Sequence, residues 1–257
     1  MSEFVHLYGI RPVQQCLSYK NRICRTLYVK DKGDSPRLKR IVESALLRDI
    51  PVKRANAHRL GTMAGTKTHQ GAVLVCSELN VLTPEEFLEA GAASPKKLLV
   101  ALDRLEDPQN VGAIIRTAAF LGASGLIVLE KKAAPLSPAV SKASAGALES
   151  FPIIRVPNLS QCLAIFRREA YSVVGSSADA SMDYRQVPVT DHMVLVLGNE
   201  SQGLRRLTQS RCDYIIRISG SRTADSLNVG AAGAILIQHL TQHIFLRRPP
   251  DEKNRIM

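Results

Sequence analysis

Short, unbroken runs of valine, isoleucine and leucine recur through the C-terminal part of the chain, separated by stretches of helical periodicity. The runs are LLVAL at 98–102, GLIVL at 125–129, YSVVGSS at 171–177, MVLVLG at 193–198 and YIIRIS at 214–219. Continuous apolar strands of this kind are typical of a parallel sheet covered by helices on both faces. The pattern therefore predicts a doubly wound α/β domain whose ligands bind beyond the carboxyl ends of the strands.

The N-terminal part predicts a smaller α/β module of its own. TLYVK and HQGAVLVCSEL are typical of strands, HLYGIRPVQQCL leads into a helix, and SPRLKRIVESALLRDI predicts an amphipathic helix opened by Ser35-Pro36. A short acidic helical stretch and a segment rich in Gly, Ala, Ser and Pro follow. We expect a first domain over 1–78, a linker over 79–95, a second domain over 96–248 and a flexible tail over 249–257.

Composition narrows the class of protein. The chain has 257 residues, 45% of them hydrophobic, which is enough to fill a substantial core. No apolar run approaches the roughly 18 residues that cross a bilayer. MSEFVHLYGI also lacks the basic start and apolar core of a signal peptide, so we expect a cytoplasmic location, or an organelle reached without an obvious signal. The five cysteines are scattered and without C-x-x-C spacing, so we expect neither disulfides nor a metal site.

The net charge of +11 is unevenly distributed. Residues 1–78 hold 14 Lys and Arg against 6 Asp and Glu, whereas residues 79–257 hold 20 against 17. A basic module joined to a nearly neutral one suggests that the first part binds a polyanion, although a solubilising surface gives the same excess. The candidate contacts are Arg11, Arg22, Arg25, Lys30, Lys32, Arg37, Lys39 and Arg40, together with Lys142 in the loop region after the second C-terminal strand, for which a solvated helix lysine is the alternative.

The loop after the first apolar run carries Asp107-Pro108-Gln109-Asn110 where a dinucleotide-binding protein would carry G-x-G-x-x-G. Asn110 is a candidate N-cap for the helix that continues through Ile114 and Ile115. Arg116 lies about 200° round the helix from Ile114, off the apolar face. Taken alone, Arg116 is equally well explained as a solvated arginine of a capped helix.

Two later loops also combine polar and small residues. LGNESQGLRRL at 197–207 places Gly198 and Gly203 around Glu200, which we expect to be a buried carboxylate able to orient an arginine. A carboxylate at a helix N-terminus is the alternative. ISGSRTADSLNVGAAGAILI at 218–237 places Ser226-Leu227-Asn228 before a helix rich in Gly and Ala, where a simple Ser or Asn cap is the alternative. Each loop is weak evidence alone, and the order and spacing of the three make it stronger.

At DPQNVGAIIRTA, LGNESQG and DSLNVGAAGAI the chain resembles the SPOUT superfamily, in its SpoU/TrmH branch of RNA ribose 2'-O-methyltransferases. HLYGIRPVQQCL and THQGAVLVCSEL resemble the L30-like substrate module of bacterial 23S rRNA (guanosine-2'-O-)-methyltransferases of the RlmB type. The similarity extends from about residue 6 to residue 246. Two departures are modest, because Ser201 stands where relatives often have Gly and Gly230 where many have Ser, and neither removes a motif residue.

The resemblance implies a deep trefoil knot in the parallel-sheet domain, which pattern reasoning alone argues against because knots are so rare. It also implies S-adenosylmethionine as methyl donor, RNA as substrate and an obligate homodimer. Carried over by motif position, the cofactor contacts are Gly198, Gly203, Ile218 and Leu227, and the catalytic residues are Asn110, Arg116, Glu200, Ser226 and Asn228.

The implied reaction is an in-line displacement, in which alignment of the two reactants lowers the barrier. The family assigns Arg116 a role at the ribose hydroxyl, but a guanidinium does not give up its proton in proteins. We therefore expect Arg116 to hold the ribose-phosphate and to stabilise the developing alkoxide. Asn110, Glu200 and Asn228 would fix the guanidinium, and Ser226 would contact the reacting group.

A guanosine of large-subunit rRNA is the expected substrate. One alternative is the same chemistry on tRNA, whose enzymes in this branch usually carry different extensions. Another is a catalytically silent RNA-binding or ribosome-assembly factor, against which the intact motif residues argue. A nicotinamide-dependent oxidoreductase is disfavoured because the glycine fingerprint and its acidic ribose partner are missing from the sequence.

Overall fold

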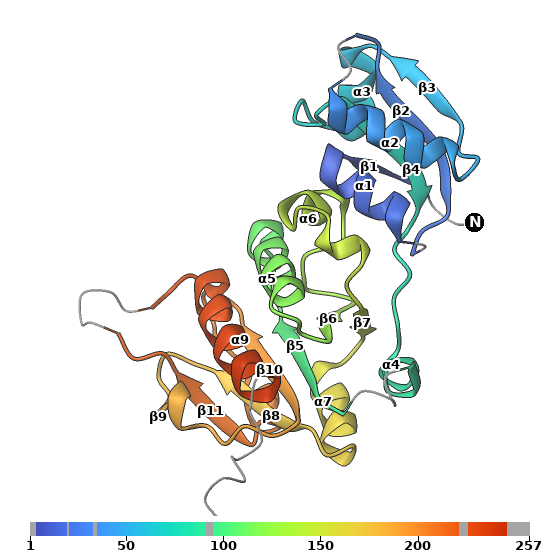
Figure 1. Ribbon diagram of the computed structural model, residues 1–257. Helices are drawn as coiled ribbons and strands as arrows, with labels where there is room; N and C mark the ends of the chain where they lie inside the picture. Colours follow the sequence, from blue (N-terminus) through green and yellow to red (C-terminus); the bar gives the residue numbers. More distant parts are fainter. Residues whose placement is uncertain (1–3, 20, 33–34, 91–94, 221–225, 246–257) are drawn as a thin grey trace, which may run out of the picture. The chain divides into compact units, whose positions relative to one another are not determined.

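The computed structural model describes residues 4–19, 21–32, 35–90, 95–220 and 226–245 (Figure 1). Contacts within the chain divide it into two compact units. The first unit comprises Met1–Leu82, Glu106–Arg116 and Ala134–Ile153, and the second comprises Thr83–Leu105, Thr117–Ala133 and Ile154–Met257. The domain boundaries expected near residues 78 and 95 stay a prediction, and the expected tail at 249–257 lies outside the described residues.

The first unit contains a four-stranded sheet with the order β1-β4-β2-β3 (Figure 1). Its strands are β1 (Phe4–Tyr8), β2 (Cys24–Lys30), β3 (Val52–Ala55) and β4 (Ala72–Ser77), and its helices include α1 (Ile10–Ser18), α2 (Pro36–Leu46) and α3 (Ala57–Ala64). Strand β4 pairs antiparallel with β1 and β2, whereas β3 runs parallel to β2. The strands expected at TLYVK and HQGAVLVCSEL are confirmed, and β1 and α3 were not anticipated.

Local sequence explains where α2 and α3 begin. The Ser35 side chain accepts a hydrogen bond from Leu38 N at 3.3 Å, and Pro36 is the first helical residue, as the sequence predicts. Asn56 caps α3 in the same way, because its Oδ1 accepts from Arg59 N at 2.9 Å. Each cap satisfies an amide that the helix itself leaves unpaired.

Two short helices complete the first unit, α6 (Pro138–Ala143) and the 3-10 helix η1 (Ala147–Glu149). Helix α5 (Pro108–Phe120) begins in this unit. A Cβ atom at Gly112 would lie 2.4 Å from Ala143 Cβ, far inside van der Waals contact. Glycine at 112 therefore lets α5 approach α6 more closely than any side chain there would allow.

The second unit contains a seven-stranded sheet with the order β7-β6-β5-β10-β8-β11-β9. The strands are β5 (Lys97–Asp103), β6 (Gly125–Leu129), β7 (Ile153–Val156), β8 (Ser172–Ser176), β9 (Met182–Asp183), β10 (His192–Gly198) and β11 (Tyr214–Arg217). The pairings β5–β6, β5–β10, β8–β10, β8–β11 and β9–β11 are all parallel. The predicted parallel sheet is confirmed, and β7 and β9 are additional strands that the apolar pattern missed.

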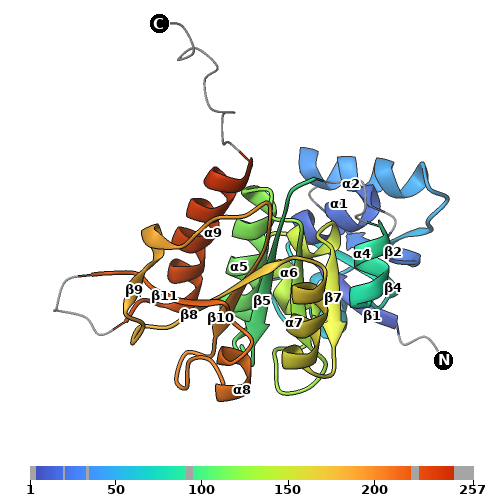
Figure 2. The ribbon, with the colours of Figure 1, turned by 90° about the horizontal axis from the view of Figure 1, so that it is seen from below.

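Helices cover the central strands of this sheet (Figure 2). Helix α9 (Val229–Phe245) contacts β5 and β10, and helix α7 (Leu159–Arg168) contacts β6 and β8. All seven residues of β5 are buried, which explains its unbroken apolar sequence. The remaining helices are α4 (Pro84–Ala90), α8 (Arg206–Gln209) and the 3-10 helix η2 (Tyr184–Gln186). Among the helices of the described residues, none is long and apolar enough to span a membrane.

Candidate active site and basic surface

The carboxyl ends of the central strands form one edge of the parallel sheet. Gly198, the last residue of β10, pairs with Asp103, the last residue of β5. Val196 and Ile215 both pair with Gly175 of β8, so the register places Gly198 and Arg217 at the same level. Two strand spacings separate them, which is about 10 Å. The loops that follow β5, β10 and β11 therefore leave the sheet side by side, at the edge where a parallel sheet binds its ligands.

A buried ion pair joins the loops after β5 and β10. Asp103 is fully buried, and its Oδ1 accepts from Arg205 Nε at 2.6 Å while its Oδ2 accepts from Arg205 N at 3.0 Å. Asn199 Nδ2 adds a hydrogen bond to Arg104 O at 2.8 Å. A buried carboxylate needs such partners, because an unpaired one would cost several kcal/mol. Asp103, Asn199 and Arg205 thus fix the position of the LGNESQG loop.

The LGNESQG loop is a tight turn that requires its glycines. Asn199 and Gly203 exchange backbone hydrogen bonds of 3.1 and 2.9 Å, and Asn199 Oδ1 accepts from Ser201 N at 2.9 Å. Gly203 has φ of 62°, in the left-handed region that glycine tolerates. A Cβ atom at Gly198 would lie 2.4 Å from Gly203 C, so the backbone itself occupies that space.

Glu200 differs from the sequence-based expectation. It lies at the tip of the turn and is exposed, so the expected burial of its carboxylate is wrong. The reason is local, because the turn is closed by the Asn199 and Gly203 backbone and points residues 200–202 outward. The next helix, α8, begins only at Arg206, so Glu200 is not an N-terminal helix residue either.

The third motif opens α9. Asn228 Oδ1 accepts from Gly230 N at 2.9 Å and from Ala231 N at 3.3 Å, which makes Asn228 the N-cap of this helix. Ser226 and Leu227 precede the cap and are exposed. The cap that the sequence suggested is confirmed, and any catalytic role of Ser226 and Asn228 stays a prediction.

The first motif begins α5, but its cap is not the predicted one. Asp107 Oδ1 accepts from Gln109 N at 2.9 Å and Pro108 is the first helical residue, so Asp107 is the N-cap and the expectation for Asn110 is wrong. Aspartate followed by proline strongly favours a helix start, so the helix already begins at Pro108 and Asn110 lies inside its first turn. Asn110 is half-buried in the first turn, and Arg116 is exposed while Ile115 is buried, as expected.

The predicted catalytic residues fall in both units. Asn110 and Arg116 belong to the first unit, whereas Glu200, Ser226 and Asn228 belong to the second. Their convergence round one ribose stays a prediction. Sequence reasoning missed Asp103, Asn199 and Arg205, although a charged residue that ends an apolar strand, as Asp103 does, is a signal that could have been used.

Most of the predicted polyanion contacts lie at the surface. The exposed ones are Arg11, Arg25, Lys32, Arg37, Lys39 and Arg40, and Lys30 is half-buried. Lys142 lies on α6 instead of in a loop and is half-buried, so it is not a fully solvated helix lysine, and its role as a polyanion contact stays a prediction. Its Nζ donates to Thr68 O at 3.1 Å, and burial lowers the pKa of its ammonium group.

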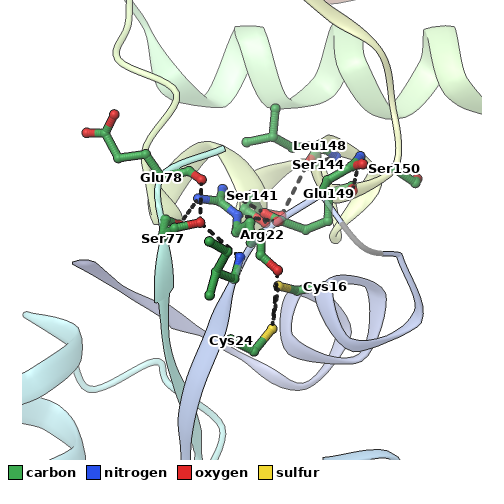
Figure 3. Close-up of polar contacts among 12 residues, drawn as sticks. Cys16, Arg22, Cys24, Ser77, Glu78, Ser141, Ser144, Leu148, Glu149 and Ser150 are labelled. Carbon is green, nitrogen blue, oxygen red and sulfur yellow. Dashed lines mark hydrogen bonds and ion pairs between the residues drawn. The ribbon is translucent and has the colours of Figure 1, made fainter. Parts of the chain in front are cut away.

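Arg22 is not a surface residue, and its prediction as a polyanion contact is wrong. Its guanidinium lies against Glu149 (Figure 3). Arg22 Nε is 2.6 Å from Glu149 Oε2, and the Arg22 side chain is only 2% exposed. Glu149 Oε1 also accepts from Ser141 Oγ at 2.7 Å, and Arg22 donates to Ser77 O at 3.0 Å. These bonds satisfy both buried charges and join the segment before β2 and the end of β4 to η1 within the first unit.

The five cysteines are free thiols, and among the described residues no cluster of His, Cys, Asp and Glu could hold a metal ion. Cys16 Sγ lies 3.9 Å from Cys24 Sγ. The hydrogen bond between these two thiols lowers the pKa of Cys24 to about 7 and, with burial, raises the pKa of Cys16. Cys24 is thus the thiol most readily ionised near neutral pH.

Comparison with known proteins accounts for both parts of the chain. The family model described as SpoU rRNA Methylase family matches residues 97–238, and the model described as RNA 2'-O ribose methyltransferase substrate binding matches residues 6–82. The 23S rRNA (guanosine-2'-O-)-methyltransferase RlmB of Coxiella burnetii is 34% identical over 238 residues, which cover 92% of this chain and 95% of that relative.

Two solved structures share the fold. The SpoU methyltransferase AviRb of Streptomyces viridochromogenes, in complex with the cofactor AdoMet, is 25% identical with a TM-score of 0.77 and covers 93% of this chain and 90% of its own. The AdoMet-bound rRNA methyltransferase of Sinorhizobium meliloti is 27% identical with a TM-score of 0.77, covering 94% of this chain and 88% of its own.

Proposed function

The chain belongs to the SpoU rRNA methylase family, and we propose that it transfers a methyl group from S-adenosylmethionine to a guanosine ribose 2'-hydroxyl in large-subunit rRNA. The observation that carries this proposal is the similarity to a 23S rRNA guanosine methyltransferase over 92% of the chain, including the substrate-binding part. A tRNA substrate is disfavoured because the N-terminal part matches along with the catalytic one. A silent binding factor is disfavoured because each motif residue is present.

The residues at the carboxyl edge of the sheet suit S-adenosylmethionine. Leu227 is a large apolar side chain that is 50% exposed, and Ile218 is half-buried directly after β11. Apolar side chains and glycine backbone form a surface appropriate to a flat, uncharged adenine ring. We propose that Gly198, Gly203, Ile218 and Leu227 hold the cofactor, which supplies a methyl group already activated on a sulfonium.

The protein's contribution to the reaction is alignment and electrostatics. In this proposal the Arg116 guanidinium binds the ribose-phosphate and stabilises the developing alkoxide, because a guanidinium retains its proton. Asn110 and Glu200 orient the guanidinium, and Ser226 contacts the reacting group. Asn228 acts chiefly as a positioning residue, since its Oδ1 is already committed to two amides of α9.

The resemblance also supports three finer proposals. We propose that the parallel-sheet part carries the trefoil knot of the family, that residues 1–78 form an L30-like module, and that the enzyme is a homodimer. The proposed dimer rests on the resemblance to the family.

Methyl transfer from labelled S-adenosylmethionine tests the proposed function directly. An unmodified transcript of bacterial 23S rRNA should become labelled at one guanosine ribose, and a tRNA pool should not. Labelling of tRNA alone would favour the tRNA alternative. If calorimetry detected no binding of S-adenosylmethionine, the silent RNA-binding factor would be correct.

A further inference from the structure

A cavity of about 260 Å³ lies in the first unit. Arg11, Arg37 and Lys142 line it, with Gln70 and apolar residues between them. Among the described residues, no acidic side chain lines the cavity. Three like charges that line one hollow favour an anion among them, because like charges repel and an anion offsets that repulsion.

Two helix N-termini add to this positive potential. Arg11 is the second residue of α1 and Arg37 is the second residue of α2, and the first turn of each helix contains no acidic residue. The N-terminus of a helix carries about half a positive charge, which favours anions and disfavours cations. Each arginine thus stands where its own helix would prefer a negative group.

The Lys142 ammonium group lies close to Gly9, the residue before α1. A Cβ atom at Gly9 would lie 3.0 Å from Lys142 Nζ, and Gly9 has φ of 97°, which side chains rarely adopt. Glycine therefore leaves room for the ammonium group beside the start of α1. The hydrogen bond from Lys142 Nζ to Thr68 O uses one of its three protons and leaves two donors.

Gln70, the uncharged polar residue of the lining, also offers a hydrogen-bond donor. Gln70 Oε1 accepts from Ile10 N at 3.1 Å, so the amide oxygen has a partner and the amide nitrogen, Nε2, can donate. The polar lining thus offers guanidinium, ammonium and amide hydrogens, a set that matches the oxygens of a phosphate group.

We propose that this cavity binds one backbone phosphate of the RNA substrate, with Arg11, Arg37 and Lys142 sharing that single phosphate. The inference rests on the proposed function for the identity of the polyanion. The volume of about 260 Å³ is ample for one phosphate group, whose oxygens can accept from all three cationic side chains. Arg11 and Arg37 are exposed, which keeps the cavity open to a polymer.

The cavity combines residues from both family matches. Arg11, Arg37 and Gln70 lie within residues 6–82, matched by the substrate-binding model, and Lys142 lies within residues 97–238, matched by the methylase model. A phosphate bound here would be held by both parts of the sequence at once. Such a contact positions the RNA and carries no information about its bases.

The test is the salt dependence of RNA binding by the full-length protein. A bacterial 23S rRNA transcript is titrated with wild type, Arg37→Ala, Lys142→Gln and the triple variant Arg11→Ala/Arg37→Ala/Lys142→Gln at several KCl concentrations. Loss of one phosphate contact lowers the slope of log K against log salt by about 0.7 to 0.9 and weakens binding roughly fivefold at 0.1 M salt. Arg168→Ala and Lys53→Ala, which remove exposed charges that do not line the cavity, are the matched controls.

If the three residues share one phosphate, the triple variant should lower the slope of log K against log salt by about as much as the loss of one phosphate contact. A decrease of two or three contacts would mean independent surface charges and would overturn the inference, as would an unchanged slope. RNA binding is also measured with inorganic phosphate added at constant ionic strength. If saturating phosphate did not weaken RNA binding, the cavity would bind a free anion and not the RNA backbone, which would also overturn the inference. Wild-type methyl transfer to the same transcript is measured in parallel, so failure of the proposed function is seen independently.

Discussion

Arg205 Nε lies 2.6 Å from Asp103 Oδ1, although the two residues are 102 positions apart in the chain. Asp103 ends β5 and Arg205 follows the glycine turn after β10, so this ion pair joins the loops of two neighbouring parallel strands. The Asp103 side chain is fully buried and the Arg205 side chain is 31% exposed. The pair therefore acts as a fixed support for the turn that we propose to hold the cofactor.

Asp103→Asn should weaken this support. It removes the charge that Arg205 pairs with and leaves the guanidinium partly buried, so we expect a loss of about 1 to 3 kcal/mol in unfolding free energy, reduced by the exposure of Arg205. Affinity for S-adenosylmethionine should fall with it. Urea denaturation and calorimetry measure the two effects. Asp191→Asn, which affects an exposed pair with Lys96 at 4.0 Å, should change neither, and equal effects in both variants would contradict the prediction.

Gly198→Ala tests the close packing of the turn itself. A methyl group at 198 would meet the Gly203 backbone at 2.4 Å, and backbone atoms cannot move aside as a flexible side chain can. We expect the turn to shift and affinity for S-adenosylmethionine to fall by at least about tenfold, the effect of roughly 1.4 kcal/mol. Gly61→Ala in α3 is the matched control, because the nearest atom to a Cβ there, Thr66 O, is at 3.7 Å, an ordinary contact. Unchanged affinity in Gly198→Ala would show that the turn does not contact the cofactor.

Glu149→Gln should destabilise the first unit strongly. Arg22 and Glu149 are almost completely buried, at 2% and 0% side-chain exposure, so neutralising one partner leaves the other charge uncompensated. The expected loss is about 3 to 5 kcal/mol in unfolding free energy. Glu43→Gln, an exposed substitution on α2, should cost less than about 0.5 kcal/mol. Equal stability of the two variants by urea denaturation would show that the ion pair adds nothing.

Cys24 should be the most reactive thiol near neutral pH. Its hydrogen bond with Cys16 lowers the Cys24 pKa to about 7, whereas burial raises the pKa of Cys162 and of Cys212 to about 12. Iodoacetamide labelling followed by peptide mass mapping should therefore modify Cys24 first, with a rate midpoint near pH 7. Cys16→Ala removes the hydrogen bond and should move that midpoint upward toward 9. A midpoint that does not move would rule out Cys16 as the cause.

The sequence predicted those elements whose pattern is local. Strands β5, β6 and β10 are unbroken apolar runs and lie where expected. Strand β9 has only two residues and β7 contains Arg155, so neither gives a clear apolar run. Helix α3 has only one fully buried side chain, Leu60, and its apolar face is correspondingly weak.

The candidate site was predictable only as far as its motifs. The glycines of LGNESQG and the cap at Asn228 follow from local chemistry, and the structure contains both. Pairs distant in sequence were not predictable from one chain, because nothing near Arg22 indicates that Glu149, 127 residues later, neutralises it. Arg22 is buried and therefore cannot belong to the polyanion surface, and the N-cap of α5 is Asp107 instead of the expected Asn110.

Arg116 offers the sharpest test of mechanism, because its proposed role is to bind and not to accept a proton. Arg116→Ala should lower kcat for methyl transfer by about 100-fold or more, the cost of removing one group that stabilises developing charge. Arg116→Lys should recover part of this loss at neutral pH, since an ammonium keeps the charge and loses the planar fork. Neither substitution should alter the unfolding free energy by more than about 0.5 kcal/mol, because the Arg116 side chain is exposed.

The pH dependence of kcat distinguishes a positioning role of Arg116 from a role as general base. If Arg116 only positions the ribose, the Arg116→Lys variant becomes no faster as its ammonium deprotonates. A Lys variant that reached the wild-type rate at high pH, with a new ionisation near the usual lysine pKa of about 10.4, would instead identify residue 116 as the base.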